Sequence, residues 1–135
     1  MKYKKEKEIF AIVRDFENST IARKDWRHAE HLTVALYYVS HHDFETALTK
    51  MRDGIFNLLK SFGVDLEKEM PYHETLTVFW IRAVSDYKNS KNGASLVETC
   101  NELVKRFDKD YPLRFYSREL LFSDAARKNF VESDL

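Results

Sequence analysis

Apolar residues recur at helical spacing along almost the whole chain, and only three glycines and two prolines interrupt them in 135 residues. The clearest run places apolar side chains on one helical face at Phe44, Ala47, Leu48, Met51, Ile55, Leu58, Leu59 and Phe62. Such a stripe is typical of a helix that packs against a core. A β-rich chain would need more glycine- and proline-containing turns than this sequence supplies. The sequence therefore predicts an all-α fold.

The length suits one domain, so residues 1–135 are expected to form a single-domain helical bundle. Breaks in the periodicity predict four to five main helices, at residues 4–16, 25–40, 44–62, 72–89 and 96–107. The less regular residues 113–135 predict a C-terminal tail of two short helices. Suitable N-cap residues precede five of these segments: Asp25, Asp43, Ser95, Ser117 and Ser123. Residues 63–71 are expected to form a loop, in which Pro71 keeps Met70 out of helical geometry.

The composition argues against two classes of partner and favours one compartment. Lys plus Arg and Asp plus Glu number 22 each, so the chain lacks the positive surplus that a general nucleic-acid binder uses. No apolar run approaches the ~18–20 residues that span a bilayer, so no membrane segment is expected. The single cysteine, Cys100, favours a reducing cytoplasm and is expected to be a small buried residue. The zero net charge neither favours nor forbids self-association.

Three histidines are the candidate functional residues. His28 and His31 lie three residues apart on a predicted helix and share a stripe with Leu32, so both imidazoles are expected to point inward. Glu30 falls on the opposite face and is expected to meet solvent. His73 opens a second helix on a stripe of the same kind. The sequence therefore predicts three inward histidines on two neighbouring helices.

Inward histidines at this spacing fit a metal site. His28 and His31 are separated by about 4.5 Å of helix rise, which allows two imidazoles to converge on one ion. His73 would be the third ligand, and Glu74 a fourth ligand, a partner orienting an imidazole, or the general base for a bound water. Three protein nitrogens and one open position are typical of catalytic sites. The sequence thus predicts a divalent metal (zinc, iron or nickel) and suggests a metal-dependent, hydrolase-like enzyme.

Other interpretations of the same residues stay open. The histidines can be neutral core groups bonded to Tyr, Thr or backbone carbonyls, which would leave a non-catalytic module for small molecules or other proteins. His73 and Glu74 can act as an acid–base dyad without metal if the helix starts after His73. Trp26, Tyr72 and Trp80 can form an aromatic pocket for a small molecule, including haem with one axial histidine. Finally, burial and protonation of histidine compete, which suits a pH-sensitive packing site.

Several segments carry a resemblance to a known family. They are Trp26-Arg-His-Ala-Glu-His-Leu32, Met51-Arg-Asp-Gly-Ile55, Tyr72-His-Glu-Thr-Leu-Thr-Val-Phe-Trp80, Tyr116-Ser-Arg-Glu-Leu-Leu-Phe-Ser123 and Phe130-Val-Glu132. Together they resemble a family of small bacterial all-helical proteins of unknown function. The resemblance covers nearly the whole chain and implies a helical fold in a bacterial protein. It implies no activity and no metal.

Overall fold

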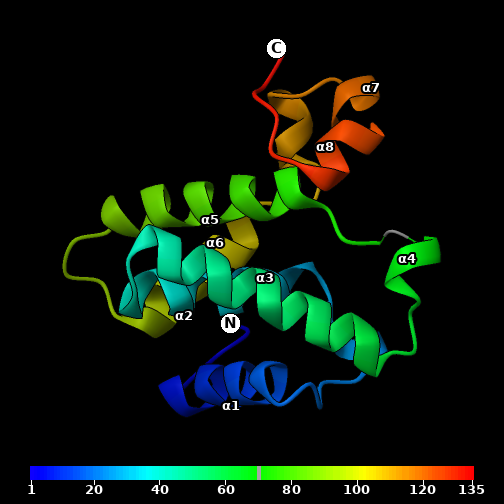
Figure 1. Ribbon diagram of the computed structural model, residues 1–135. Helices are drawn as coiled ribbons and strands as arrows, with labels where there is room; N and C mark the ends of the chain where they lie inside the picture. The colour runs from blue at the N-terminus through cyan, green and yellow to red at the C-terminus, as the bar shows by residue number, and fades with distance from the viewer. Residues whose placement is uncertain (70) are drawn as a thin grey trace.

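The computed structural model describes residues 1–69 and 71–135, and these residues form helices and connecting segments without any strand (Figure 1). The predicted all-α fold is confirmed. The α-helices are α1 (Glu6–Glu17), α2 (His28–His41), α3 (Phe44–Ser61), α4 (Leu66–Glu69), α5 (Glu74–Asn89), α6 (Leu96–Arg106), α7 (Arg118–Leu121) and α8 (Asp124–Lys128). Two 3-10 turns, η1 (Arg23–Asp25) and η2 (Tyr111–Arg114), join them. None of the described helices combines the length and apolar character needed to cross a bilayer.

Helix α2 is the centre of the bundle. It packs against α1, α3, α5 and α6, and five consecutive residues, 32–36, are completely or almost completely shielded from solvent. A helix that is buried on every side cannot show a single apolar stripe. The expected amphipathic pattern for this segment was therefore wrong on its outer face. Glu30 is buried there, where it accepts a hydrogen bond from the Arg27 amide and pairs with Lys2 at 2.9 Å.

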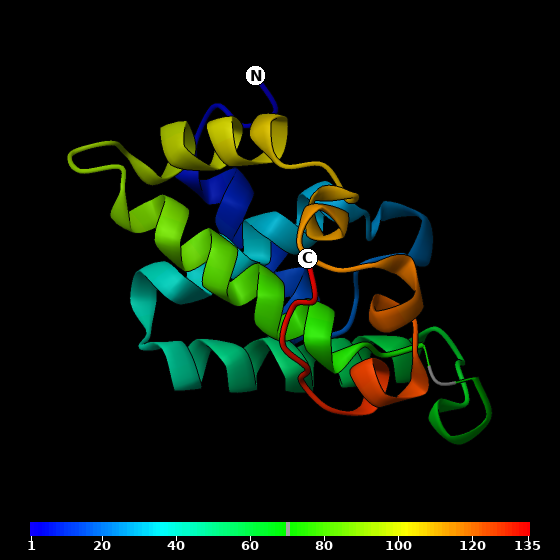
Figure 2. The ribbon, with the colours of Figure 1, turned by 90° about the horizontal axis from the view of Figure 1, so that it is seen from above.

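The first and the last helices of the chain lie at opposite edges of the molecule. Figure 1 shows α1 at one edge of the molecule and the short helices α7 and α8 at the other, beyond α5. Helices α3 and α8 both contact α5, and α8 does so near the end of α5 at which that helix begins. Seen from above in Figure 2, the C-terminal segment crosses the same end of α5. This end of α5 is therefore where three separate parts of the chain meet.

Most helix ends follow the local signals of the sequence. Asp43, Ser95, Ser117 and Ser123 each accept a hydrogen bond from an amide in the first turn of their helix, so these four predicted caps are confirmed. Gly63 follows α3 with a φ of 79°, a left-handed conformation that glycine adopts without steric cost. The predicted loop 63–71 contains the short helix α4, and Met70 lies outside the described residues.

Two predicted helix starts were wrong. Asp25 lies in η1 and does not cap α2; that helix begins at His28, and the Glu30 carboxylate satisfies the Arg27 amide instead. Helix α5 begins at Glu74 rather than at Tyr72, because the ring of His73 acts as its N-cap. The His73 ring accepts the Leu76 amide hydrogen at the N-cap, a role that aspartate or serine fills more often.

The C-terminal segment is tied to α5 through Thr75. Its buried hydroxyl group bonds to the carbonyl oxygens of Ala126 (2.7 Å) and Asn129 (3.0 Å) and accepts from the Val131 amide (3.2 Å). The Tyr116 hydroxyl donates to the Val131 carbonyl at 2.6 Å, which closes the segment on itself. Thr75 thus fixes the position of α8 and of the residues that follow it.

Candidate functional site

His73 has both ring nitrogens engaged. Nδ1 accepts the amide hydrogen of Leu76 at 3.1 Å, and Nε2 lies 2.5 Å from the Leu121 carbonyl oxygen. A carbonyl only accepts, so Nε2 carries the proton and the ring is neutral. Burial lowers the pKa of His73, the Leu121 carbonyl opposes this, and the nearby Arg127 lowers it further. The ring therefore joins the start of α5 to α7 as a structural group.

His28 and His31 lie in different surroundings. His28 donates from Nε2 to the Phe107 carbonyl at 3.0 Å and packs edge-on against the Trp80 ring, with 4.9 Å between ring centroids. His31 packs against Trp26 at 6.0 Å. Burial, and secondarily the nearby His28, lower the pKa of His31 from 6.5 to about 4. Both histidines point inward as predicted, and the pKa of His31 keeps its ring neutral near pH 7.

The three histidines line one cavity, which we call the histidine cavity. Its volume is about 310 Å³, and its other walls include Trp26, Leu59, Tyr72 and Leu76. Helices α2 and α5 are neighbours, as the prediction required. Among the described residues, however, no three His, Cys, Asp or Glu side chains are grouped so as to hold an ion. A metal on His73 would have to break the bond that caps α5 or the bond to Leu121. The donor set does not fit a three-histidine site in this conformation, and the metal stays a prediction.

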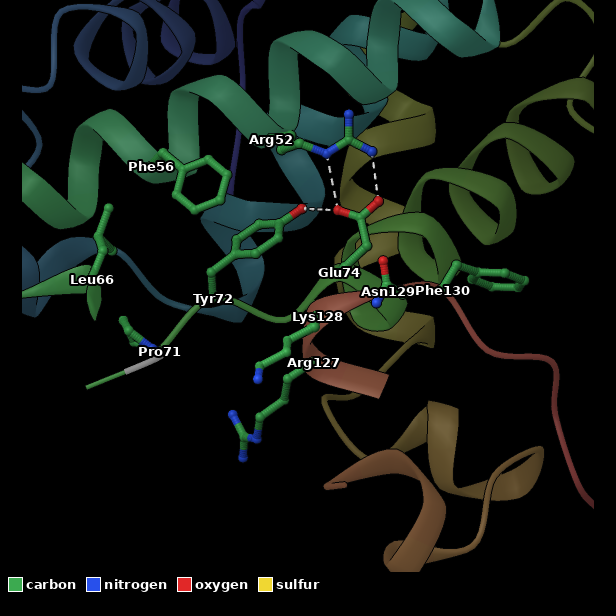
Figure 3. A pocket seen from close by; sticks show the side chains of 10 residues that line it. All are labelled: Arg52, Phe56, Leu66, Pro71, Tyr72, Glu74, Arg127, Lys128, Asn129 and Phe130. Atoms are coloured by element: carbon green, nitrogen blue, oxygen red, sulfur yellow. Dashed lines mark hydrogen bonds and ion pairs between the residues drawn. The ribbon is translucent and has the colours of Figure 1, made fainter. Parts of the chain in front are cut away.

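Glu74 has hydrogen-bond partners other than His73. Arg52 of α3 binds both of its carboxylate oxygens, from Nε at 2.9 Å and from Nη2 at 2.6 Å, and the Tyr72 hydroxyl donates to Oε1 at 2.6 Å (Figure 3). Burial works to raise the pKa of Glu74, but the bonds from Arg52 and Tyr72 outweigh it, so the pKa is lowered. The pKa of Tyr72 is raised by burial and by its bond to the carboxylate. Glu74 is therefore better suited to be a permanently ionised group that holds Arg52 and Tyr72 in position than to be a base that takes up a proton.

A second cavity, which we call the α8 pocket, lies beside Arg52, Tyr72 and Glu74, between α3, α5 and α8. Its volume is about 530 Å³ (Figure 3). Its apolar wall consists of Phe56, Leu66, Pro71, Tyr72 and Phe130. Its polar side chains are Arg52, Glu74, Arg127, Lys128 and Asn129. The rings of Phe56 and Tyr72 face each other with 4.4 Å between centroids and form a firm aromatic surface.

The predicted aromatic residues are divided among different surroundings. Tyr72 lines both cavities, and Trp26 lines only the histidine cavity, where it also stacks on Phe16 at 5.0 Å. Trp80 is 4% exposed and packs among Phe79, Phe107 and Tyr111 in the core. These three rings therefore do not enclose one pocket. Cys100 is fully buried, and burial raises the pKa of its thiol to about 11, as expected for a structural cysteine.

Sequence reasoning missed the cations of the α8 pocket. Arg52 lies 22 residues from its partner Glu74, and nothing local in the sequence connects the two. Arg127 and Lys128 belong to a short tail helix whose place on α5 depends on Thr75. The only sequence signal was the Ser123 cap, which predicts a helix there but not its neighbours.

Comparison of the chain with protein-family models, curated proteins and solved structures gives no match. The resemblance to a family of small bacterial proteins stays a prediction. The function is therefore argued from the geometry of the two cavities.

Proposed function

We propose that this protein binds a small organic anion with an apolar body in the α8 pocket, without catalysing a reaction on it. The observation that supports this most is the combination of an aromatic wall with two cations that form no ion pair with a described carboxylate. A volume of about 530 Å³ lies within the roughly 300–1,000 Å³ typical of small-molecule sites.

The charge of the ligand follows from the state of each polar group. Glu74, the only carboxylate among the described lining residues, is neutralised by Arg52. Arg127 and Lys128 line the opposite side of the pocket and take part in no salt bridge among the described side chains. The net potential in the pocket is therefore positive, which favours a carboxylate, sulfonate or phosphate group at α8.

The apolar body of the ligand follows from the Phe56–Tyr72 surface. Tyr72 is held in place by its bond to Glu74, so the ring is already ordered before a ligand arrives. A preordered aromatic surface binds apolar groups with little loss of side-chain freedom. The same bond explains why Tyr72 contributes packing rather than a free hydroxyl group.

Anilinonaphthalene sulfonate, a fluorescent aromatic anion, tests this proposal directly. We expect saturable binding to the native protein, with about fourfold weaker affinity in Lys128→Ala and in Arg127→Ala, because each loses one partly exposed charge contact worth up to ~1 kcal/mol. Arg118→Ala removes an exposed cation from the same tail outside the pocket and should leave the affinity unchanged. Equal affinity in wild type and in the variant lacking both cations would contradict the proposal, provided near-ultraviolet circular dichroism shows the same packing.

The metal hypothesis has a separate test with a definite expected result. Because both ring nitrogens of His73 are hydrogen-bonded, we expect wild type and His73→Asn to bind Zn²⁺ with equal affinity in calorimetric titrations at neutral pH. Asparagine keeps a side chain that can cap a helix, so α5 should persist. One equivalent of tightly bound zinc in wild type that disappears in the variant would instead establish the three-histidine site.

A further inference from the structure

The two cavities adjoin each other at Pro71 and Tyr72, which line both of them. The α8 pocket supplies the cations, and the histidine cavity lies on the other side of these two residues. Tyr72 is tethered by its hydroxyl group to Glu74 and by its ring to Phe56, so it forms a fixed divider. A ligand that occupies both cavities would have to pass this divider.

Several polar groups that line the histidine cavity are already paired within the protein. His73 uses both ring nitrogens, and the Thr77 hydroxyl donates to the His73 carbonyl at 3.0 Å. His28 bonds to the Phe107 carbonyl, and Arg27 donates from Nε to the Lys24 carbonyl at 3.1 Å.

What remains for a ligand in this cavity is largely hydrocarbon and aromatic surface. Trp26, Ile55, Leu59 and Leu76 supply it, together with the neutral imidazole of His31. Burying the methylene groups of a ligand against these side chains is favourable.

We infer that the ligand is an amphiphilic anion: an anionic head group at Arg127 and Lys128, joined to an unbranched hydrocarbon chain that passes Tyr72 into the histidine cavity. This inference rests on the proposed function and adds the class of ligand to it. The head group is placed by charge, since two cations, Arg127 and Lys128, line the α8 side, whereas the exposed Arg27 is the one cation among the described residues that line the histidine cavity. The hydrocarbon chain is placed by the apolar side chains of Trp26, Ile55, Leu59 and Leu76 on the other side.

Straight-chain carboxylates from butanoate to dodecanoate test the inference by displacement of anilinonaphthalene sulfonate, each below its micelle concentration. We expect affinity to rise about fourfold per methylene group, since each buried CH₂ contributes about 0.8 kcal/mol, until the histidine cavity is full. Decanol should bind more weakly than decanoate, because it has no charge for Arg127 and Lys128. Affinities that do not depend on chain length, with sulfonate binding intact, would overturn the inference and leave the proposed function standing.

A variant whose larger side chain fills the histidine cavity tests whether the hydrocarbon chain of the ligand lies there. Leu59→Trp should abolish the gain in affinity of the longer acids over butanoate, and Ile55→Phe provides a second variant should the first fail to fold. If affinity still rises with the length of the carboxylate in a folded variant of this kind, the hydrocarbon chain lies elsewhere and the inference is wrong. If wild type fails to bind both the sulfonate and all carboxylates, the proposed function fails as well.

Discussion

Acidification from pH 6.5 to pH 4 is expected to remove about 3 kcal/mol of folding free energy through His31 alone. The pKa of His31 is about 4 in the folded protein against 6.5 for an ordinary histidine. The unfolded chain therefore takes up a proton first as the pH falls. The stabilisation that His31 contributes is complete above pH 6.5, declines between pH 6.5 and 4, and does not change further below pH 4. Each unit of difference between the unfolded and folded pKa corresponds to about 1.4 kcal/mol. The lowered pKa of His73 acts in the same direction.

Urea unfolding at a series of pH values measures this dependence. The His31→Gln variant keeps a neutral side chain of similar reach and should show a clearly shallower decline between pH 6.5 and 4. Nuclear magnetic resonance titration of the ring protons reports the pKa of His31 in the folded protein directly. Identical declines in wild type and variant would mean that the ring is hydrated and titrates normally.

Gly54→Ala is expected to destabilise the fold by about 3 kcal/mol, although alanine normally favours a helix. Gly54 lies in α3 where that helix meets α1, and an added Cβ would overlap the ring of Phe16. Phe16 is fully buried and stacked on Trp26, so its ring has no free space to enter. Forcing atoms into such a packed region costs more than the helix propensity returns.

Thermal and urea unfolding compare this variant with two controls. Asp53→Ala changes the exposed neighbour on the same helix and should alter stability by less than about 0.5 kcal/mol. Phe16→Leu combined with Gly54→Ala should be less unstable than the sum of the two single changes, because the smaller side chain makes room for the new methyl group. Simple additivity would show that Gly54 matters for a reason other than this contact.

The helices were predictable from the sequence because their signals are local. The apolar stripe of α3 and the oxygen-bearing caps at Asp43 and Ser95 act within one or two turns of the chain. Helix α2 was harder to interpret, because Leu32, Ala35 and Val39 fit the single apolar face of an amphipathic helix. Its burial on all sides depends on four other helices, and no pattern within α2 reports their presence.

The candidate site was predictable only in part. The inward direction of the histidines followed from helical periodicity, and Tyr72 was correctly expected near them. Their hydrogen-bond partners were not predictable, because the carbonyls of Phe107 and Leu121 belong to distant segments, and any residue type supplies a carbonyl. The pairing of Glu74 with Arg52 likewise depends on how α3 and α5 lie against each other.

The attachment of α8 through Thr75 has a consequence for the order of biosynthesis. A ribosome releases Phe56 and Tyr72 well before Arg127 and Phe130, so one wall of the α8 pocket emerges while its other wall is still being made. During that interval the aromatic surface of the nascent chain has no cover. Until Thr75 receives the backbone groups that hold α8 in place, we expect this exposed surface to favour contact with chaperones or with other copies of the chain.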